Sequence, residues 1–236
     1  MIGNHFKQMD STGNDTKLTF LEKIILLALD DKGWFGNSEN SIKFGLAGAI
    51  LYELFKHDRI EFKEGVLVAK DPASMNDPLF DRVLEFIRTV KKNRSIRSWI
   101  QRMVYKKMMI RKSIIRSLIA KNMIRKEEYS FFWVMYQFKY PVVNSELKNR
   151  VRSEIFNRIM NEEKLNGYDL MMISVMDSCK IYRKNFRNFA NYPKFRKRIK
   201  DILRFNDPGI EDVKLIGAID YAIRRAIVAS NVSIHA

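Results

Sequence analysis

The sequence predicts a mainly α-helical fold, a single globular multi-helix domain with two small β-hairpins. The chain has 236 residues, of which 46% are hydrophobic, and this is enough for one sizeable core. Apolar residues recur at a helical period through most of the chain, whereas only two short segments read as paired strands. We place the domain at residues 18–230, behind a polar, flexible N-terminal tail at residues 1–17.

Helices are expected where apolar residues at a helical period follow a capping residue or a turn. In chain order they cover residues 19–29, 41–55, 77–87, 95–103, 106–122, 145–159, 170–181 and 210–229. Thr19 and Glu22 have the spacing of a capping box at the first helix, and Gly33 is a candidate left-handed cap at its end. A cationic segment at residues 184–204 precedes the last helix.

The two expected hairpins differ in character. The first joins residues 59–62 to residues 66–69, and the second joins residues 123–125 to residues 131–139, with Glu127–Glu128 near its turn. The second arm of the later hairpin has aromatic side chains on both faces. Such a strand is either buried on both sides or in contact with a partner or lipid, and the sequence leaves both interpretations open.

Charge is concentrated in one stretch of the chain. The formal net charge is +16, and fourteen cations with no carboxylate lie between Arg88 and Lys126. The aromatic segment from Tyr129 to Tyr140 follows directly. This arrangement favours a polyanionic partner, and both membranes and nucleic acids are polyanions.

Several classes of function find no support in the sequence. No segment approaches the ~18 apolar residues that a membrane-spanning helix needs. The chain has one cysteine and three scattered histidines, and it contains no phosphate loop and no zinc-protease or dinucleotide motif. We therefore expect a non-enzymatic, cytoplasmic protein without metal or cofactor, which meets a membrane from the side.

Arg111 occupies an anomalous position. It lies within the apolar seam of the helix expected at residues 106–122, where a buried unpaired charge would cost several kcal/mol or more. One interpretation is an internal ion pair or a side chain that extends outward to solvent. The other is an anion-binding arginine at the end of a groove, with Lys107 one turn earlier on the same face.

A colinear series of segments carries a family resemblance. The segments are LTFLE (18–22), LLALDDKG (26–33), GLAGAILYEL (45–54), RIE (59–61), NDPLFD (76–81), SWI (98–100), RSLIAKNMI (116–124) and YPV (140–142). Their order and spacing resemble the Golgi phosphoprotein 3 family over about residues 18–228. The resemblance implies a mostly helical protein that binds phosphatidylinositol 4-phosphate on membranes. In eukaryotic members it also implies an adaptor that retains glycosyltransferases through their cytosolic tails.

The lipid pocket of the family is only partly matched. That pocket uses a tryptophan, the arginine of a GLRG segment, and two basic residues three apart on the helix before the hairpin. The first three of these positions fall on Ser38, Ala47 and Met108, and only the last is retained, as Arg111. Such replacements fit a distant member, for example a bacterial one, with a different anionic ligand.

The resemblance also assigns candidate site residues. With a shifted geometry, the lipid headgroup site would consist of Arg111, Lys107, Lys43 and Trp34. The family uses the hairpin, here about residues 123–141, for self-association and membrane contact. This role would fall to Phe131, Phe132, Trp133 and Tyr136.

Two functions remain in competition. The preferred one is a peripheral membrane protein that binds anionic phospholipid headgroups, forms homo-oligomers through its hairpin and holds cytosolic tails of membrane proteins. The alternative is a winged-helix-like nucleic-acid-binding protein, since a basic helix followed by a hairpin is the order such proteins need. The apolar seam around Arg111 counts against the alternative because it leaves no clean solvated recognition face.

Overall fold

The computed structural model describes residues 17–63, 65–71, 73–90, 94–106, 108–131, 135–161, 164–205 and 212–232, and residues 1–16 of the predicted tail lie outside this range. The helices are α1 (Phe20–Ala28), η1 (Gly36–Ser38), α2 (Ile42–Lys56), α3 (Pro78–Thr89), α4 (Ile96–Tyr105), α5 (Ile110–Ala120), α6 (Ser145–Met160), α7 (Gly167–Ser178), α8 (Tyr182–Phe186), α9 (Tyr192–Ile202) and α10 (Val213–Val232). The strands are β1 (Ile60–Lys63), β2 (Val66–Ala69), β3 (Arg94–Ser95), β4 (Glu127–Phe131) and β5 (Met135–Lys139). The mainly helical fold predicted from the sequence is confirmed.

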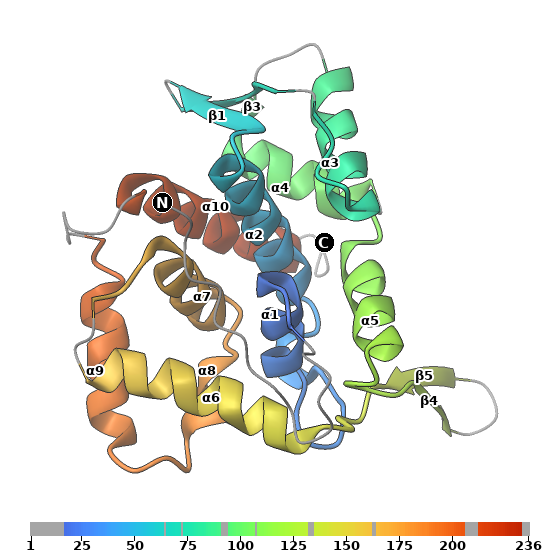
Figure 1. Ribbon diagram of the computed structural model, residues 1–236, viewed down its shortest axis with the longest axis vertical. Helices are drawn as coiled ribbons and strands as arrows, with labels where there is room; N and C mark the ends of the chain where they lie inside the picture. Colours follow the sequence, from blue (N-terminus) through green and yellow to red (C-terminus); the bar gives the residue numbers. More distant parts are fainter. Residues whose placement is uncertain are drawn as a thin grey trace.

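Helix α2 lies at the centre of the molecule, packed against α1, α4, α5, α7 and α10 (Figure 1). Two glycines allow this close packing. A Cβ atom at Gly45 would meet Cys179, and one at Gly48 would meet Ile219 and Ile223. The small residues of the second predicted helix therefore let two other helices approach its backbone.

Helix α1 is capped at both ends, but from different sources. At its start Thr19 and Glu22 form the predicted capping box, with the Glu22 N–H donating to Thr19 Oγ1 at 3.3 Å. At its end the carbonyls of residues 27, 28 and 29 accept hydrogen bonds from Asn185, Lys184 and Lys148 respectively. Cations from α6 and α8 thus satisfy the negative end of the α1 dipole, which has no basic residue of its own.

Gly33 is left-handed, as expected, but it is not the cap of α1. The cap is Leu29 in an extended conformation, while Gly33 (φ +88°) lies four residues later. The Tyr140 N–H donates to the Gly33 carbonyl at 2.8 Å, and a Cβ at Gly33 would overlap the backbone of Tyr140 and Pro141. Glycine is needed here because the loop after α1 docks on the base of the second hairpin.

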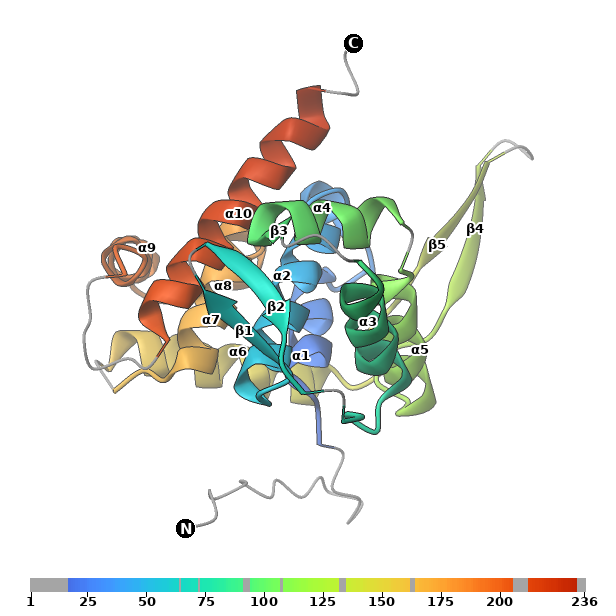
Figure 2. The ribbon, with the colours of Figure 1, turned by 90° about the horizontal axis from the view of Figure 1, so that it is seen from above.

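Both hairpins are present, with one addition and two corrections. Strand β3 pairs with β2 and extends the first hairpin to three strands. In the second hairpin the first strand, β4, begins at Glu127, so the first arm predicted at residues 123–125 is wrong. Glu127 pairs with Lys139 and Glu128 with Phe138, so the prediction that Glu127–Glu128 lie near the turn is also wrong. These carboxylates lie at the base of the hairpin, where Glu127 forms an ion pair with Lys139 on the neighbouring strand. Figures 1 and 2 show β4 and β5 projecting from the helical body.

The helix predicted at residues 106–122 begins later than expected. Helix α4 ends at Tyr105, and α5 begins at Ile110 after Met109, whose backbone is left-handed (φ 55°). The predicted residue Lys107 lies outside the described residues. Other boundaries shift by a few residues: α7 begins at Gly167 behind an Asn166 capping box, α10 begins at Val213, and residues 184–204 contribute to both α8 and α9.

Within the described ranges, no helix combines the length and the apolar composition needed to cross a bilayer.

Candidate functional site

The loop after α1 is shaped by one carboxylate. Asp30 Oδ1 accepts hydrogen bonds from the N–H groups of Lys32 at 2.9 Å and Trp34 at 2.8 Å. The Asp30 N–H in turn donates to the Trp34 carbonyl at 2.8 Å. This turn holds the Trp34 ring edge-on to Tyr129 of β4, with centroids 6.0 Å apart.

A groove lies between this loop and the hairpin base. It has a volume of about 460 Å³ and is lined by Lys32, Trp34, Arg125, Glu127, Tyr129, Lys139 and Pro141. Lys139 Nζ lies 2.8 Å and Arg125 Nε 2.5 Å from the Glu127 carboxylate. The hydrogen bond from Lys139, and then that from Arg125, holds the pKa of Glu127 below its ordinary value. Lys32 is exposed, and among the described residues its ammonium group has no partner.

Arg111 lies on the other side of the same loop. Its guanidinium is paired with Glu39 and stands 5.0 Å above the Phe35 ring. Its side chain is 37% exposed, so the arginine in the apolar seam reaches outward and is not buried. The ion-pair interpretation therefore describes the observed structure, and an anion could bind the remaining N–H groups of Arg111 or replace Glu39.

The contact between the loop after α1 and the base of the hairpin connects the groove with Arg111. Phe35 packs edge-on against Tyr140, with centroids 6.3 Å apart, and Gly33 binds the backbone of the same tyrosine. Burial raises the pKa of Tyr140, which opposes its ionisation beside this cationic surface. Trp34 and Arg111, two of the four residues predicted for headgroup binding, thus flank one junction.

Lys43 lies elsewhere. Its ammonium group is 5.3 Å from the ring centroid of Phe44, and Phe44 also contacts Tyr105 at the end of α4. The described contact of Lys43 is therefore with Phe44, and not with Arg111 or the groove. The fourth predicted residue, Lys107, is among the residues that the structure does not describe.

Three cations of the groove were not singled out from the sequence. They are Lys32, Arg125 and Lys139. A signal was present, because positions 127 and 129 share one face of β4 and Arg125 lies two residues before this strand. The mistaken turn at Glu127–Glu128 concealed this alternation and with it the pairing of Glu127 with Lys139.

The predicted hairpin residues are only partly described. Phe131 ends β4 and pairs with Met135, Tyr136 pairs with Ser130, and Phe132 and Trp133 lie outside the described residues. Nearer the base, Tyr129 is 46% and Phe138 is 42% exposed. Lys126 Nζ lies 3.7 Å from the Phe138 ring centroid. The hairpin therefore presents aromatic side chains beside cations.

Helix α5 offers little surface for reading nucleic acid. Its residues Ile110, Ile114, Ile115 and Leu118 are buried. Lys112 and Arg116 are exposed, while the ammonium group of Lys121, which follows the helix, is 2.7 Å from the buried Glu22 carboxylate. Two exposed cations on a helix buried along its other side make a poor recognition face.

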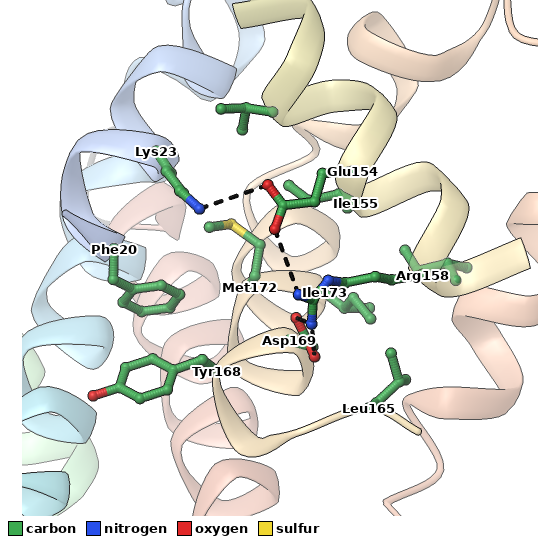
Figure 3. A pocket seen from close by; sticks show the side chains of 12 residues that line it. Phe20, Lys23, Glu154, Ile155, Arg158, Leu165, Tyr168, Asp169, Met172 and Ile173 are labelled. Carbon is green, nitrogen blue, oxygen red and sulfur yellow. Dashed lines mark hydrogen bonds and ion pairs between the residues drawn. The ribbon is translucent and has the colours of Figure 1, made fainter. Parts of the chain in front are cut away.

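A second cavity lies between α1, α6 and α7 (Figure 3). Its volume of about 90 Å³ is lined mostly by apolar side chains, including Phe20, Ile155 and Met172. The charges at its rim pair with one another: Lys23 lies 3.8 Å and Arg158 3.6 Å from Glu154, and Arg158 also pairs with Asp169 at 3.0 Å. These mutual pairs leave the rim without an uncompensated cation, so the cavity is a poorer anion site than the groove.

Comparison with known families identifies the chain. The model of the family described as Golgi phosphoprotein 3 (GPP34) matches residues 21–220. The matched range runs from α1 into α10. It therefore includes the loop after α1, the groove, Arg111 and the hairpin.

Proposed function

Because this chain belongs to the Golgi phosphoprotein 3 family, we propose that it is a non-enzymatic peripheral membrane protein that binds anionic phospholipid headgroups. Phosphatidylinositol 4-phosphate, the lipid bound by the family, is one candidate headgroup. The observation that carries the proposal is the groove beside Trp34, which is lined by two further cations and by Lys32, a side chain with no partner among the described residues.

The groove has the groups that a phosphate ester needs. Lys32 is a free donor, while Arg125 and Lys139 are held in place by Glu127 and keep further N–H groups for a ligand. Trp34, at the edge of the groove, is suited to the region between headgroups and acyl chains. Each cation close to an anionic leaflet contributes about 1 kcal/mol, so a few of them give useful affinity.

Arg111 forms the second half of the proposed headgroup site. Its pairing with Glu39 holds the guanidinium above Phe35, and a phosphate that replaces Glu39 would find it already oriented. Lys43 and Lys107 are proposed to add long-range attraction, which decays over a Debye length of about 8–10 Å.

The hairpin is proposed to contact the membrane or a second copy of the chain. Its aromatic residues Phe131, Phe132, Trp133 and Tyr136 would form this contact, and cytosolic tails of membrane proteins are the proposed clients. Sedimentation of a Phe132→Asp, Trp133→Asp double variant tests self-association. A mass equal to that of the wild type would count against it.

Flotation with vesicles tests the lipid proposal. Neutral vesicles are compared with vesicles that contain phosphatidylinositol 4-phosphate or a simple anionic phospholipid at equal charge. We expect the wild type to float with anionic vesicles, Arg111→Glu to float less and Glu39→Gln to float more, because Arg111 is then free. Lys197→Glu, on the exposed face of α9, is the control for a cation lost elsewhere.

Two outcomes would change the proposal. An Arg111→Glu protein that floats as well as the wild type would remove Arg111 from the site. Sub-micromolar, steeply salt-dependent binding to duplex DNA without vesicle binding would instead support the winged-helix alternative.

A further inference from the structure

The junction between α4 and α5 exposes two large apolar side chains. Tyr105 is 57% and Met109 is 53% exposed, although most large apolar residues of the described chain are buried. Both lie at helix ends, Tyr105 as the last residue of α4 and Met109 as the left-handed residue before α5. Neighbouring exposed apolar groups on a protein surface often mark a contact site.

Cations surround this apolar pair. Lys106 and Lys112 are exposed on either side of it, and Arg102 stands 5.8 Å above the Phe86 ring one turn before Tyr105. The whole stretch at residues 88–126 contains no carboxylate. Exposed apolar and cationic residues therefore alternate along this junction, which complements an anionic layer that covers an apolar interior.

The junction is held in shape by the core and by backbone hydrogen bonds. The Tyr105 ring packs edge-on against the buried Phe44, with centroids 6.5 Å apart. The Met108 N–H donates to the Met103 carbonyl at 3.3 Å, and the Ser113 N–H donates to the Met109 carbonyl at 2.9 Å. The backbone at Met109 and the ring of Tyr105 are therefore held before binding, which lowers the ordering cost of a membrane contact.

The junction and the hairpin extend on the same side of the molecule. In Figure 2 the end of α4 lies along the upper edge of the body, and β4 and β5 project toward the same upper side. The end of α4 and the hairpin therefore face the same side of the molecule, toward which α10 also extends.

We propose that Tyr105 and Met109 form a second membrane-inserting element, which enters the interface of an anionic bilayer beside the hairpin. This inference rests on the proposed lipid-binding function. A tyrosine ring suits the headgroup level, and a methionine chain adapts to disordered acyl chains. Lys106 and Lys112 would then lie at the level of the phosphates.

A fluorescent label tests this insertion directly. Cys179 is the only cysteine and is fully buried, and burial raises the pKa of its thiol to about 12, so a new surface cysteine can be labelled selectively. Met109→Cys and, as control, Lys197→Cys on α9 receive an environment-sensitive dye. With phosphatidylglycerol-containing vesicles, we expect a blue shift and quenching by nitroxide lipids at position 109 only.

The outcomes separate this inference from the proposed function. If the labelled Met109→Cys protein floats but its dye neither shifts nor is quenched, the proposed insertion is wrong and the proposed lipid binding stands. If neither labelled protein floats, the proposed insertion and the proposed lipid binding are both wrong. A dye that responds to soluble polyglutamate and not to vesicles would assign the surface to an acidic protein partner instead.

A second pair of variants checks affinity without a label. Tyr105→Ser, Met109→Ser keeps every charge, and we expect it to weaken vesicle binding about tenfold, because two apolar groups no longer enter the interface. Val143→Ser, at a 46% exposed apolar residue before α6, is the matched control. A loss no greater than that of the control would overturn the proposal. Thermal melts show whether both variants remain folded.

Discussion

Two cationic regions lie at opposite ends of the molecule (Figure 1) and are built differently. One runs from the end of α4 to the start of β4, and the other comprises α8 and α9. In the first, Tyr105, Met109 and Tyr129 are exposed among the cations. In the second, residues 183–204 contain nine cations and a single carboxylate, Asp201, but the large apolar residues point inward.

In the second region, the aromatic side chain of Phe195 packs against α6 and α8. Phe195 of α9 is fully buried and stacks with Phe156 of α6, with centroids 5.0 Å apart, and with Phe186 of α8 at 4.8 Å. The exposed side of α9 is left with Lys194, Arg196, Lys197 and Lys200. Charge alone attracts a polyanion at long range, whereas insertion also needs exposed apolar groups, and only the first region has both.

The largest expected effect concerns stability and would confirm that the apolar face of α9 belongs to the core. Phe195→Ala should lower the free energy of unfolding by about 3–5 kcal/mol, because it leaves a cavity in a packed aromatic cluster. Urea unfolding measures this loss. The folded fraction should bind vesicles as the wild type does, and a specific loss of binding would show that α9 takes part in the membrane contact.

Removal of equal charge from the groove and from the second region tests the comparison itself, because the groove joins Arg125 of the first region to Lys32 and Lys139. Replacement of three groove cations by glutamine (Lys32→Gln, Arg125→Gln, Lys139→Gln) should weaken vesicle binding on the order of 100-fold, at about 1 kcal/mol per cation. The matched triple on α9 (Arg196→Gln, Lys197→Gln, Lys200→Gln) should weaken it less than about threefold. Equal losses would mean that the membrane senses only the total charge, and the distinction between the regions would fail.

One cation of the second region, Lys184, stabilises the loop after α1, which lines the groove. Lys184 of α8 donates to the Phe35 carbonyl at 3.0 Å, in the loop that carries Trp34 and contacts Arg111, and to the last turn of α1. Lys184→Met should cost about 1 kcal/mol of stability, the worth of a typical hydrogen bond. Vesicle binding should fall a few-fold as the loop loosens. Lys194→Met, on exposed α9, should change neither quantity, and identical behaviour of the two variants would refute this link.

A further effect concerns pH. Burial lowers the pKa of Lys184 to about 8, so between pH 8 and 10.5 the folded protein binds fewer protons at this site than the unfolded chain. The contribution of this group to stability is therefore present above about pH 10.5 and is lost as pH falls toward 8. The stability difference between wild type and Lys184→Met should grow in favour of the wild type from pH 8 to 10. A flat difference would contradict the lowered pKa.

Much of the fold could be predicted because its signals are local. The capping box of Thr19 and Glu22 and the helical periods depend on neighbours within one or two turns, and both are confirmed. One error falls where a distant contact overrides a local pattern, because Gly33 docks on Tyr140 and does not cap α1. Another is the helix start predicted at residue 106, since α4 ends at Tyr105 and α5 begins at Ile110, after a left-handed Met109.

The site could be predicted only in outline. The family resemblance and the misplaced Arg111 indicated a cationic lipid site near the hairpin, and the family is confirmed. The groove cations Lys32, Arg125 and Lys139 come from two segments far apart in the chain. Their grouping depends on how the loop at Gly33 docks on Tyr140, which no local pattern encodes.

The sequence by itself therefore determined the helices, the hairpins, the family and the total charge of this protein. Only the tertiary structure decided which cations are free to bind a ligand. Arg111 is paired with Glu39, 72 residues earlier, and Lys184 donates to carbonyl groups about 150 residues away, while Lys32 has no partner in the part of the chain that the structure describes. The reason is physical: the charge of a side chain is a property of its residue type, but its partners depend on which surfaces pack together.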